Sequence, residues 1–302
     1  MKYLLQHPEP IGADNDLLAT CDIPGVARAL EAAGWDGIAF TEHPAPGRRW
    51  LEEGGGHQTL DPFVALGAVA AVTERLRLVT YLSVLPYRNP FLTAKAAATL
   101  DILSRGRFVL GVGTGYLKGE FHALGVDFDE RNTLFDEAIE AMRLHWSGEP
   151  FSFEGTHFNA RDLLARPKPS GPIPIWLGGN ARLTRRRVAE KAQGWMPMTG
   201  SAELASTTRT AALPDLDAVA TAVREVKEAA GPRADEIDVM ILYTDETILE
   251  TGKDVERHRD QLGRMREAGA TWVSFAFDLP TEAATLEFIG GFAADHLGAD
   301  RA

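Results

Sequence analysis

Side chains able to move protons follow the first two apolar runs of the chain. His7 comes after the run Lys2–Leu5, and Glu42 and His43 come at the end of the run Gly37–Thr41. Histidine titrates near neutral pH, and a neighbouring carboxylate can orient its ring. The pair Glu42-His43 therefore indicates proton transfer. The alternative is that His43 only caps the turn before the next proline.

Two glycine-rich stretches could lie against a phosphate or a planar ligand. The stretch LGVGTGYLKGE at 110–120 does not match the dinucleotide fingerprint G-x-G-x-x-G, and its plainer interpretation is a tight turn from a strand into a helix. Gly178-Gly179 precedes a helical pattern, where free backbone N–H groups and the helix dipole favour a phosphate. Arg182, one turn further, could add a positive charge. The other arginines of that helix are expected to face solvent: Arg185, Arg186 and Arg187.

A metal centre is the alternative use for the histidines. A barrel hydrolase could gather His7, Glu42, His43, His57 and His122 around an ion. Many such enzymes present two histidines one residue apart at the first strand, whereas this chain has only His7 there. We therefore predict no metal.

Composition indicates a soluble protein with an acidic balance. The 302 residues are 45% hydrophobic and 25% charged, and 31 basic against 43 acidic residues give a net charge of −12. That sign argues against nucleic acid or an anionic membrane surface as a partner. No apolar run is long enough for a membrane span, and the first ten residues do not form a signal peptide. Cys21 is the single cysteine, which excludes an intrachain disulfide, so we expect a cytoplasmic protein.

Short apolar runs alternate with helical patterns along the chain, and several of these runs are continuously apolar, as strands buried on both faces are. This order predicts an α/β protein, a single (β/α)₈ TIM barrel over residues 1–302 with insertion loops at its C-terminal face. A doubly wound open sheet is the alternative. The predicted strands are Lys2–Leu5, Gly37–Thr41, Arg77–Leu85, Arg107–Gly111, Ile173–Leu177, Gly194–Pro197, Asp238–Tyr243 and Thr271–Phe277.

Helix starts and long connections can also be placed. Asp61 and Asn89 each precede a proline and are expected to cap a helix. Segments 43–60 and 148–172 are long for barrel loops, which is typical of lids or excursions. The helix after Asn89 is expected to bury a stripe formed by Leu92, Ala96, Thr99, Leu100 and Leu103.

Four stretches together resemble the bacterial luciferase-like monooxygenase superfamily. They are TEHPAP, TLDPFVALGAVAAVTERLRL, LPYRNPFLTAKAAATLDILSRGRFVLGVGTGYLKGEFHALGVDFDERNTLFDEA and PIPIWLGGNARLTRRRVAEKAQGWMP. Within the superfamily, the chain resembles the branch of coenzyme F420-dependent oxidoreductases. The resemblance is dense over residues 35–200 and implies a flavin or deazaflavin bound at the carboxyl ends of the barrel strands.

The resemblance also implies roles for individual residues. Glu42-His43 matches the acid–histidine pair of F420 enzymes, although aspartate is commoner at the first position, and both residues are catalytic candidates. The glycine turn is implied to lie along the cofactor, because glycines permit close approach. A non-proline cis peptide of the family corresponds to Tyr81-Leu82. The implied cofactor-binding residues are His7, Tyr81, Leu82, Asn89, Gly113, Thr114, Gly115, Tyr116, Glu120, Trp176, Gly178, Gly179, Asn180 and Arg182.

The activity implied by this resemblance is hydride transfer between F420 and a small organic substrate. One alternative is an FMN-dependent monooxygenase that takes reduced flavin from a partner reductase and activates oxygen. Another is a catalytically silent flavin-binding relative, in which we would expect the polar strand ends to be lost. The family also suggests a homodimer. Segments 47–60 and 199–214 are expected to shape the substrate site, but they do not identify the substrate.

Overall fold

The computed structural model describes residues 1–302 except 10, 12–16, 18–21, 201 and 299–302, so Cys21 lies outside the described residues. In the described chain, eight parallel strands follow one another around a closed barrel, because β3 pairs with β5 and β1 with β11. They are β1 (Lys2–Gln6), β2 (Gly37–Phe40), β3 (Arg77–Thr80), β5 (Phe108–Gly113), β8 (Ile175–Gly178), β9 (Gly194–Met196), β10 (Asp238–Tyr243) and β11 (Trp272–Phe275).

Each barrel strand overlaps one of the runs predicted from the sequence, with β1, β5 and β8 continuing one or two residues beyond it, and the (β/α)₈ fold class is confirmed. The alternative of an open doubly wound sheet is wrong, since the sheet closes on itself. The third run, Arg77–Leu85, is interrupted by a cis peptide between Tyr81 and Leu82, as the resemblance implied. Beyond that bond the short strand β4 (Ser83–Val84) continues the pairing with β5.

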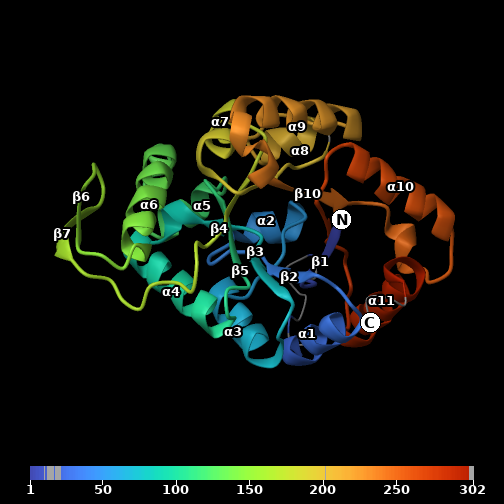
Figure 1. The fold of residues 1–302 in the computed structure, drawn as a ribbon. Coiled ribbons are helices and arrows are strands. Elements are labelled where there is room, and N and C mark those ends of the chain that lie inside the picture. Colours follow the sequence, from blue (N-terminus) through green and yellow to red (C-terminus); the bar gives the residue numbers. More distant parts are fainter. Residues whose placement is uncertain (10, 12–16, 18–21, 201, 299–302) are drawn as a thin grey trace.

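Helices surround the barrel (Figure 1). The outer ring is formed by α1 (Ile23–Ala32), α3 (Pro62–Val72), α4 (Pro90–Leu103), α6 (Arg131–Trp146), α7 (Arg182–Lys191), α9 (Leu216–Ala230), α10 (Val255–Glu267) and α11 (Glu282–Phe292). Shorter helices lie in the connections, namely α2 (Arg48–Glu53), α5 (Lys118–Ala123), α8 (Ala202–Thr207), the 3₁₀ turns Leu85–Tyr87, Gly231–Glu236 and Glu246–Leu249, and the π turn Ala293–Leu297. In the described residues, no helix is long and apolar enough to cross a membrane.

The predicted helix caps are confirmed, but of the stripe predicted to be buried on α4 only Leu100 is buried. Asp61 accepts the backbone N–H groups of two first-turn residues of α3, and Asn89 accepts that of Phe91 in α4. Leu92 and Leu103 of α4 are 73% and 59% exposed. Small side chains allow this helix to approach its neighbours closely, so its buried face is formed instead by Thr93, Ala94, Ala97, Ala98, Leu100 and Asp101.

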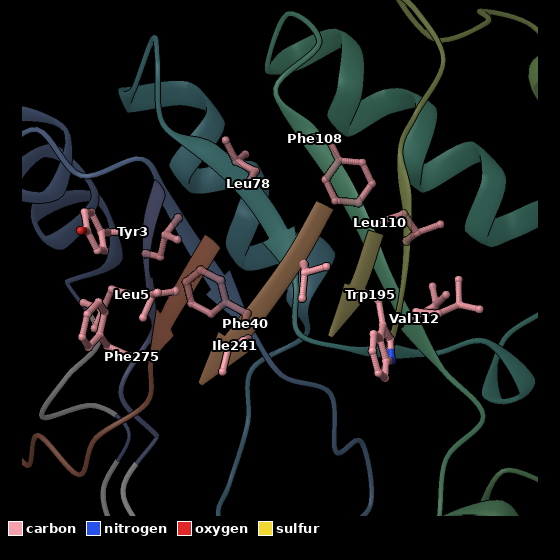
Figure 2. Packing of buried hydrophobic residues seen from close by; sticks show 14 of the residues in the cluster. Tyr3, Leu5, Phe40, Leu78, Phe108, Leu110, Val112, Trp195, Ile241 and Phe275 are labelled. Carbon is pink, nitrogen blue, oxygen red and sulfur yellow. The ribbon is translucent and has the colours of Figure 1, made fainter. Parts of the chain in front are cut away.

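The core has two layers separated by the strands. Side chains such as Leu5, Phe40 and Phe108 belong to the cluster that joins the strands to the helices, part of which Figure 2 shows. Alternate strand residues form a second cluster, as the two faces of a closed barrel require. Its members are Leu4, Ala39, Val79, Val109, Trp176, Met196, Met240 and Trp272.

The two long segments differ in where they lie. Segment 148–172 forms an antiparallel hairpin of β6 (Phe151–Glu154) and β7 (Asn159–Leu163) to the side of the barrel, beyond α4 and α6 (Figure 1). Segment 43–60 carries α2 and contacts the carboxyl ends of the strands, as described below. Segment 43–60 therefore contributes to the site, whereas the hairpin of segment 148–172 lies away from it.

Candidate active site

A cavity of about 260 Å³ opens at the carboxyl ends of the barrel strands. Its walls come from the segments that follow β2, β3, β5, β8 and β9, which a parallel barrel brings to one end. The cavity brings together ten residues singled out in the sequence: Glu42, His43, Tyr81, Leu82, Gly113, Thr114, Gly115, Tyr116, Gly178 and Gly179. Their part in binding or catalysis stays a prediction.

The His43 side chain is held on several sides and is 12% exposed. Its Nδ1 lies 3.3 Å from Oε2 of Glu120, and its backbone N–H donates to Thr59 Oγ1 at 2.9 Å. The ring packs against Trp50 of α2, with ring centroids 4.5 Å apart. With Nδ1 facing a carboxylate, Nε2 is the nitrogen left for chemistry, and it makes no hydrogen bond to a described residue.

Glu120 is the carboxylate that contacts His43. It is 1% exposed, and Tyr87 donates its hydroxyl to Oε2 at 2.8 Å. Burial together with the nearby Glu120 charge raises the pKa of Tyr87 far above its usual value, so this hydroxyl stays protonated and remains a donor. The same two causes, burial and the Glu120 charge, raise the pKa of Tyr116 to about 12, and this residue lines the cavity.

The Glu42 carboxylate is bonded to residues other than His43, whose ring it was expected to orient. Its carboxylate accepts hydrogen bonds from Ser83 Oγ at 2.8 Å, the Val84 N–H at 2.7 Å and Arg88 Nε at 2.6 Å. The expectation that Glu42 orients the neighbouring His43 ring is wrong, because Glu120 is the carboxylate beside His43 Nδ1 and the Glu42 carboxylate is bonded to other residues. Burial lowers the pKa of Arg88, but the Glu42 and Asp61 carboxylates outweigh it and raise this pKa overall.

A second histidine–carboxylate pair lies beside His43. His57 Nδ1 is 3.2 Å from Oε2 of Glu9, which also accepts the hydroxyl of Thr41. The His57 ring meets the His43 ring edge to face, with centroids 5.3 Å apart. Sequence reasoning missed Glu9, although it follows the first strand by only three residues and its position there was a usable signal.

The end of the cavity at Gly179 is rich in hydrogen-bond donors. Gly179 has a φ of +102°, and a Cβ there would lie 3.7 Å from Thr210 Oγ1 and 3.8 Å from Thr184 Oγ1. Thr208 and Arg209 also line this region. Thr208 and Thr210 were not singled out because segment 199–214 has no distinctive sequence pattern. The Thr210 hydroxyl accepts the Asn180 N–H and still has its own proton to donate, and the left-handed backbone at Gly179 favours glycine. Hydroxyl donors at this end fit a phosphate.

Two of the predicted glycines are explained by packing. A Cβ at Gly113 would lie 2.5 Å from a methyl carbon of Leu82, and a Cβ at Gly178 would lie 2.1 Å from the other. A side chain at either position would therefore displace the end of the Leu82 side chain from the floor of the cavity. In the glycine-rich stretch 110–120, Gly113 therefore leaves room for the Leu82 side chain.

Six predicted cofactor-binding residues are not part of the cavity wall. Glu120 lies behind His43, and the Asn89 side chain caps α4. The His7 ring stacks on Phe40 with centroids 4.8 Å apart, and Trp176 packs inside the barrel against Trp272.

The other two lie after β8. Asn180 uses its side chain to bond the backbone of Met198 and Ala211, which fixes segment 199–214 beside the cavity. Arg182 lines a separate hollow between α7 and α9.

The arginines of α7 differ in their exposure and in their carboxylate partners. Arg185 pairs with Glu225, and Arg186 is exposed as predicted. Arg187 was expected to face solvent, but it is 2% exposed and donates to both carboxylate oxygens of Asp136. This prediction is wrong because the α7 surface bearing Arg187 packs against α6. No group of three or more metal-ligating side chains is found in the part of the chain that the structure describes.

Comparison with known proteins gives consistent matches. The family profile described as luciferase-like monooxygenase matches residues 7–261. An uncharacterised protein of Mycobacterium tuberculosis is 30% identical over 84% of this chain and 84% of its own. An F420-dependent glucose-6-phosphate dehydrogenase of Nakamurella multipartita is 32% identical over 76% of this chain and 64% of its own. Among solved structures, a monooxygenase of Streptomyces bottropensis has a TM-score of 0.74 at 21% identity, covering 98% of this chain and 99% of that one, which shows a shared fold.

Proposed function

Because the chain belongs to the luciferase-like monooxygenase family, we propose that it moves a hydride between coenzyme F420 and a small organic substrate. The observation that carries this proposal is the His43–Glu120 pair at the wall of a cavity that has one apolar part and one donor-rich end. The relative named as F420-dependent, at 32% identity, supports the choice of cofactor.

The residues of the cavity suit a deazaflavin or flavin. Leu82, Val84 and Met196 give an apolar surface for a planar ring. The hydroxyls of Thr184 and Thr210 suit a phosphate, whereas the Gly179 N–H is already donated to the Met196 carbonyl. When bound, F420 supplies a carrier that accepts or gives up two electrons as a hydride.

His43 has the geometry of a general acid or base. With Nδ1 directed to Glu120, its Nε2 can take the proton that leaves a substrate hydroxyl, or return one to a carbonyl oxygen in the reverse direction. Glu120 stabilises the imidazolium that forms, and the Tyr87 hydroxyl holds the Glu120 carboxylate in place. Trp50 covers one side of the ring and keeps water from it.

Binding titrations of the purified protein with F420, FMN and FAD test the proposal. We expect F420 to bind most tightly, and His43→Ala to remove turnover while keeping F420 bound. Tight binding of FMN with no binding of F420 would overturn the proposal and favour the monooxygenase that depends on a partner reductase. Binding of F420 with no turnover of any alcohol or carbonyl compound would favour the silent relative.

A further inference from the structure

Three positively charged side chains converge on one aromatic ring beside the cavity. Lys118 Nζ, Arg131 Cζ and Arg209 Cζ lie 5.0, 3.9 and 5.1 Å from the centroid of the Phe128 ring. They come from three different elements: the start of α5, the start of α6 and the turn after α8. We call Lys118, Arg131 and Arg209 the Phe128 cation cluster.

None of these three cations forms an ion pair with a described carboxylate, whereas the nearby Arg187 does, with Asp136. Asp127 and Asp129 flank Phe128 in the chain, but neither is within ion-pair distance of the cluster. Like charges around one ring repel one another, and the ring offsets this only in part. On a chain with a net charge of −12, such an arrangement favours an anionic ligand.

The cluster adjoins the donor-rich end of the cavity. Arg209 itself lines the cavity, and its neighbour Thr210 is one of the hydroxyls next to Gly179. Lys118 follows the wall residue Tyr116 by two positions. A ligand whose phosphate lies at Gly179 and which continues beyond that phosphate would therefore reach these cations.

We infer that the Phe128 cation cluster binds the carboxylates of the F420 tail, an inference that rests on the proposed function. The cavity, about 260 Å³, is smaller than usual ligand pockets of roughly 300–1,000 Å³, so a cofactor with a long tail extends beyond it. FMN ends at its phosphate, whereas F420 continues through lactate into a chain of glutamates. The cluster thus discriminates between the two cofactors by charge.

The test compares the affinities of F420 molecules that carry one glutamate and several, measured by fluorescence titration without substrate. We expect the longer tail to bind about tenfold more tightly at low ionic strength, with most of this advantage lost at high salt. The variant K118Q/R131Q/R209Q should bind both forms equally. The control R186Q/R224Q/R264Q changes the net charge by the same amount on exposed positions of outer helices and should keep the preference.

Arg131 also donates to the Phe128 carbonyl, so the triple variant could lose local structure. The double variant K118Q/R209Q avoids this and should still lose most of the preference for the longer tail. Tight F420 binding that is independent of tail length, or a preference unchanged in both cluster variants, would overturn the inference while leaving the proposed function intact. A raised KM for an anionic substrate with unchanged cofactor affinity would also overturn it, because the cluster would then bind substrate. If no form of F420 binds, the proposed function itself fails.

Discussion

Replacing Glu120 by glutamine should slow turnover while leaving the fold intact. Glutamine keeps the shape of the side chain and can still accept the Tyr87 hydroxyl, but it removes the charge that faces His43 Nδ1 at 3.3 Å. A hydrogen bond to a charged group contributes roughly 1.5–3 kcal/mol. If that contribution is made mainly in the transition state, when the imidazolium forms, kcat falls about 10- to 150-fold. The affinity for F420 should change little, because Glu120 is not part of the cavity wall.

Glu42→Gln should instead lower the stability of the fold and leave turnover per folded molecule nearly unchanged. This residue is 4% exposed, and its carboxylate accepts from Ser83, Val84 and Arg88. Glutamine leaves the Arg88 charge without this partner and presents an N–H group to other donors. Breaking a buried charge pair costs about 3–5 kcal/mol, although Arg88 keeps Asp61, which places the loss near the lower value.

Two measurements on the same preparations separate these outcomes. Thermal unfolding followed by circular dichroism should show a Tm lowered by roughly 5–10 °C for Glu42→Gln and nearly unchanged for Glu120→Gln. Turnover per folded molecule, measured by the loss of the visible absorbance of oxidised F420, should fall for Glu120→Gln and stay nearly unchanged for Glu42→Gln. A stable Glu42→Gln variant without turnover, together with a fully active Glu120→Gln, would refute the reasoning and restore Glu42 as the partner of His43.

Further outcomes are expected at other positions. His43→Ala should lower kcat about 10²–10⁴-fold and change cofactor affinity by no more than a few-fold; a stable variant with full turnover would end the assignment of His43 as acid or base. Gly179→Asp should weaken F420 binding at least tenfold more, about 1.4 kcal/mol, than Gly179→Ala, which shares the backbone strain but not the charge; equal affinities would place the phosphate elsewhere. Asp136→Asn should cost roughly 1–3 kcal/mol at pH 7, since Arg187 loses a partner that is itself partly exposed. Burial raises the pKa of Asp136, but Arg187 and Lys191 outweigh it and lower this pKa overall, so the difference in Tm between wild type and variant should shrink as pH falls below about 3.9. A constant difference down to pH 3 would contradict this linkage.

The barrel could be predicted from the sequence because its signals are local. Strands buried on both faces are continuous apolar runs, and the caps at Asp61 and Asn89 act within three residues of themselves. The number and order of these runs favoured a closed barrel but left an open sheet as the alternative, and the pairings of β3 with β5 and β1 with β11 decide for closure. Most of the buried face of α4 was not predicted, because the prediction relied on large leucines, whereas small alanines pack where this helix approaches its neighbours closely.

The partners within the site could not be predicted by the same reasoning. Glu120 is 77 positions from His43, while Glu42 is adjacent, and only the fold shows that the distant residue makes the contact. The same holds for α7, where Arg186 and Arg187 are neighbours of one type but only Arg187 meets a carboxylate from α6. A local pattern identifies which side chains could react, whereas the pairing among them depends on contacts between distant segments.

Segment 43–60 holds the His43 side chain in its place at the wall of the cavity. Trp50 packs on the His43 ring, Thr59 bonds its backbone, and His57 meets it edge to face. Gly56 lets the segment fold tightly over the indole, since a Cβ there would lie 2.4 Å from Trp50 Cε3. A displacement of this segment would therefore move the histidine. Under the proposed function, a substrate that shifts this segment should therefore change the rate of proton transfer together with its own affinity.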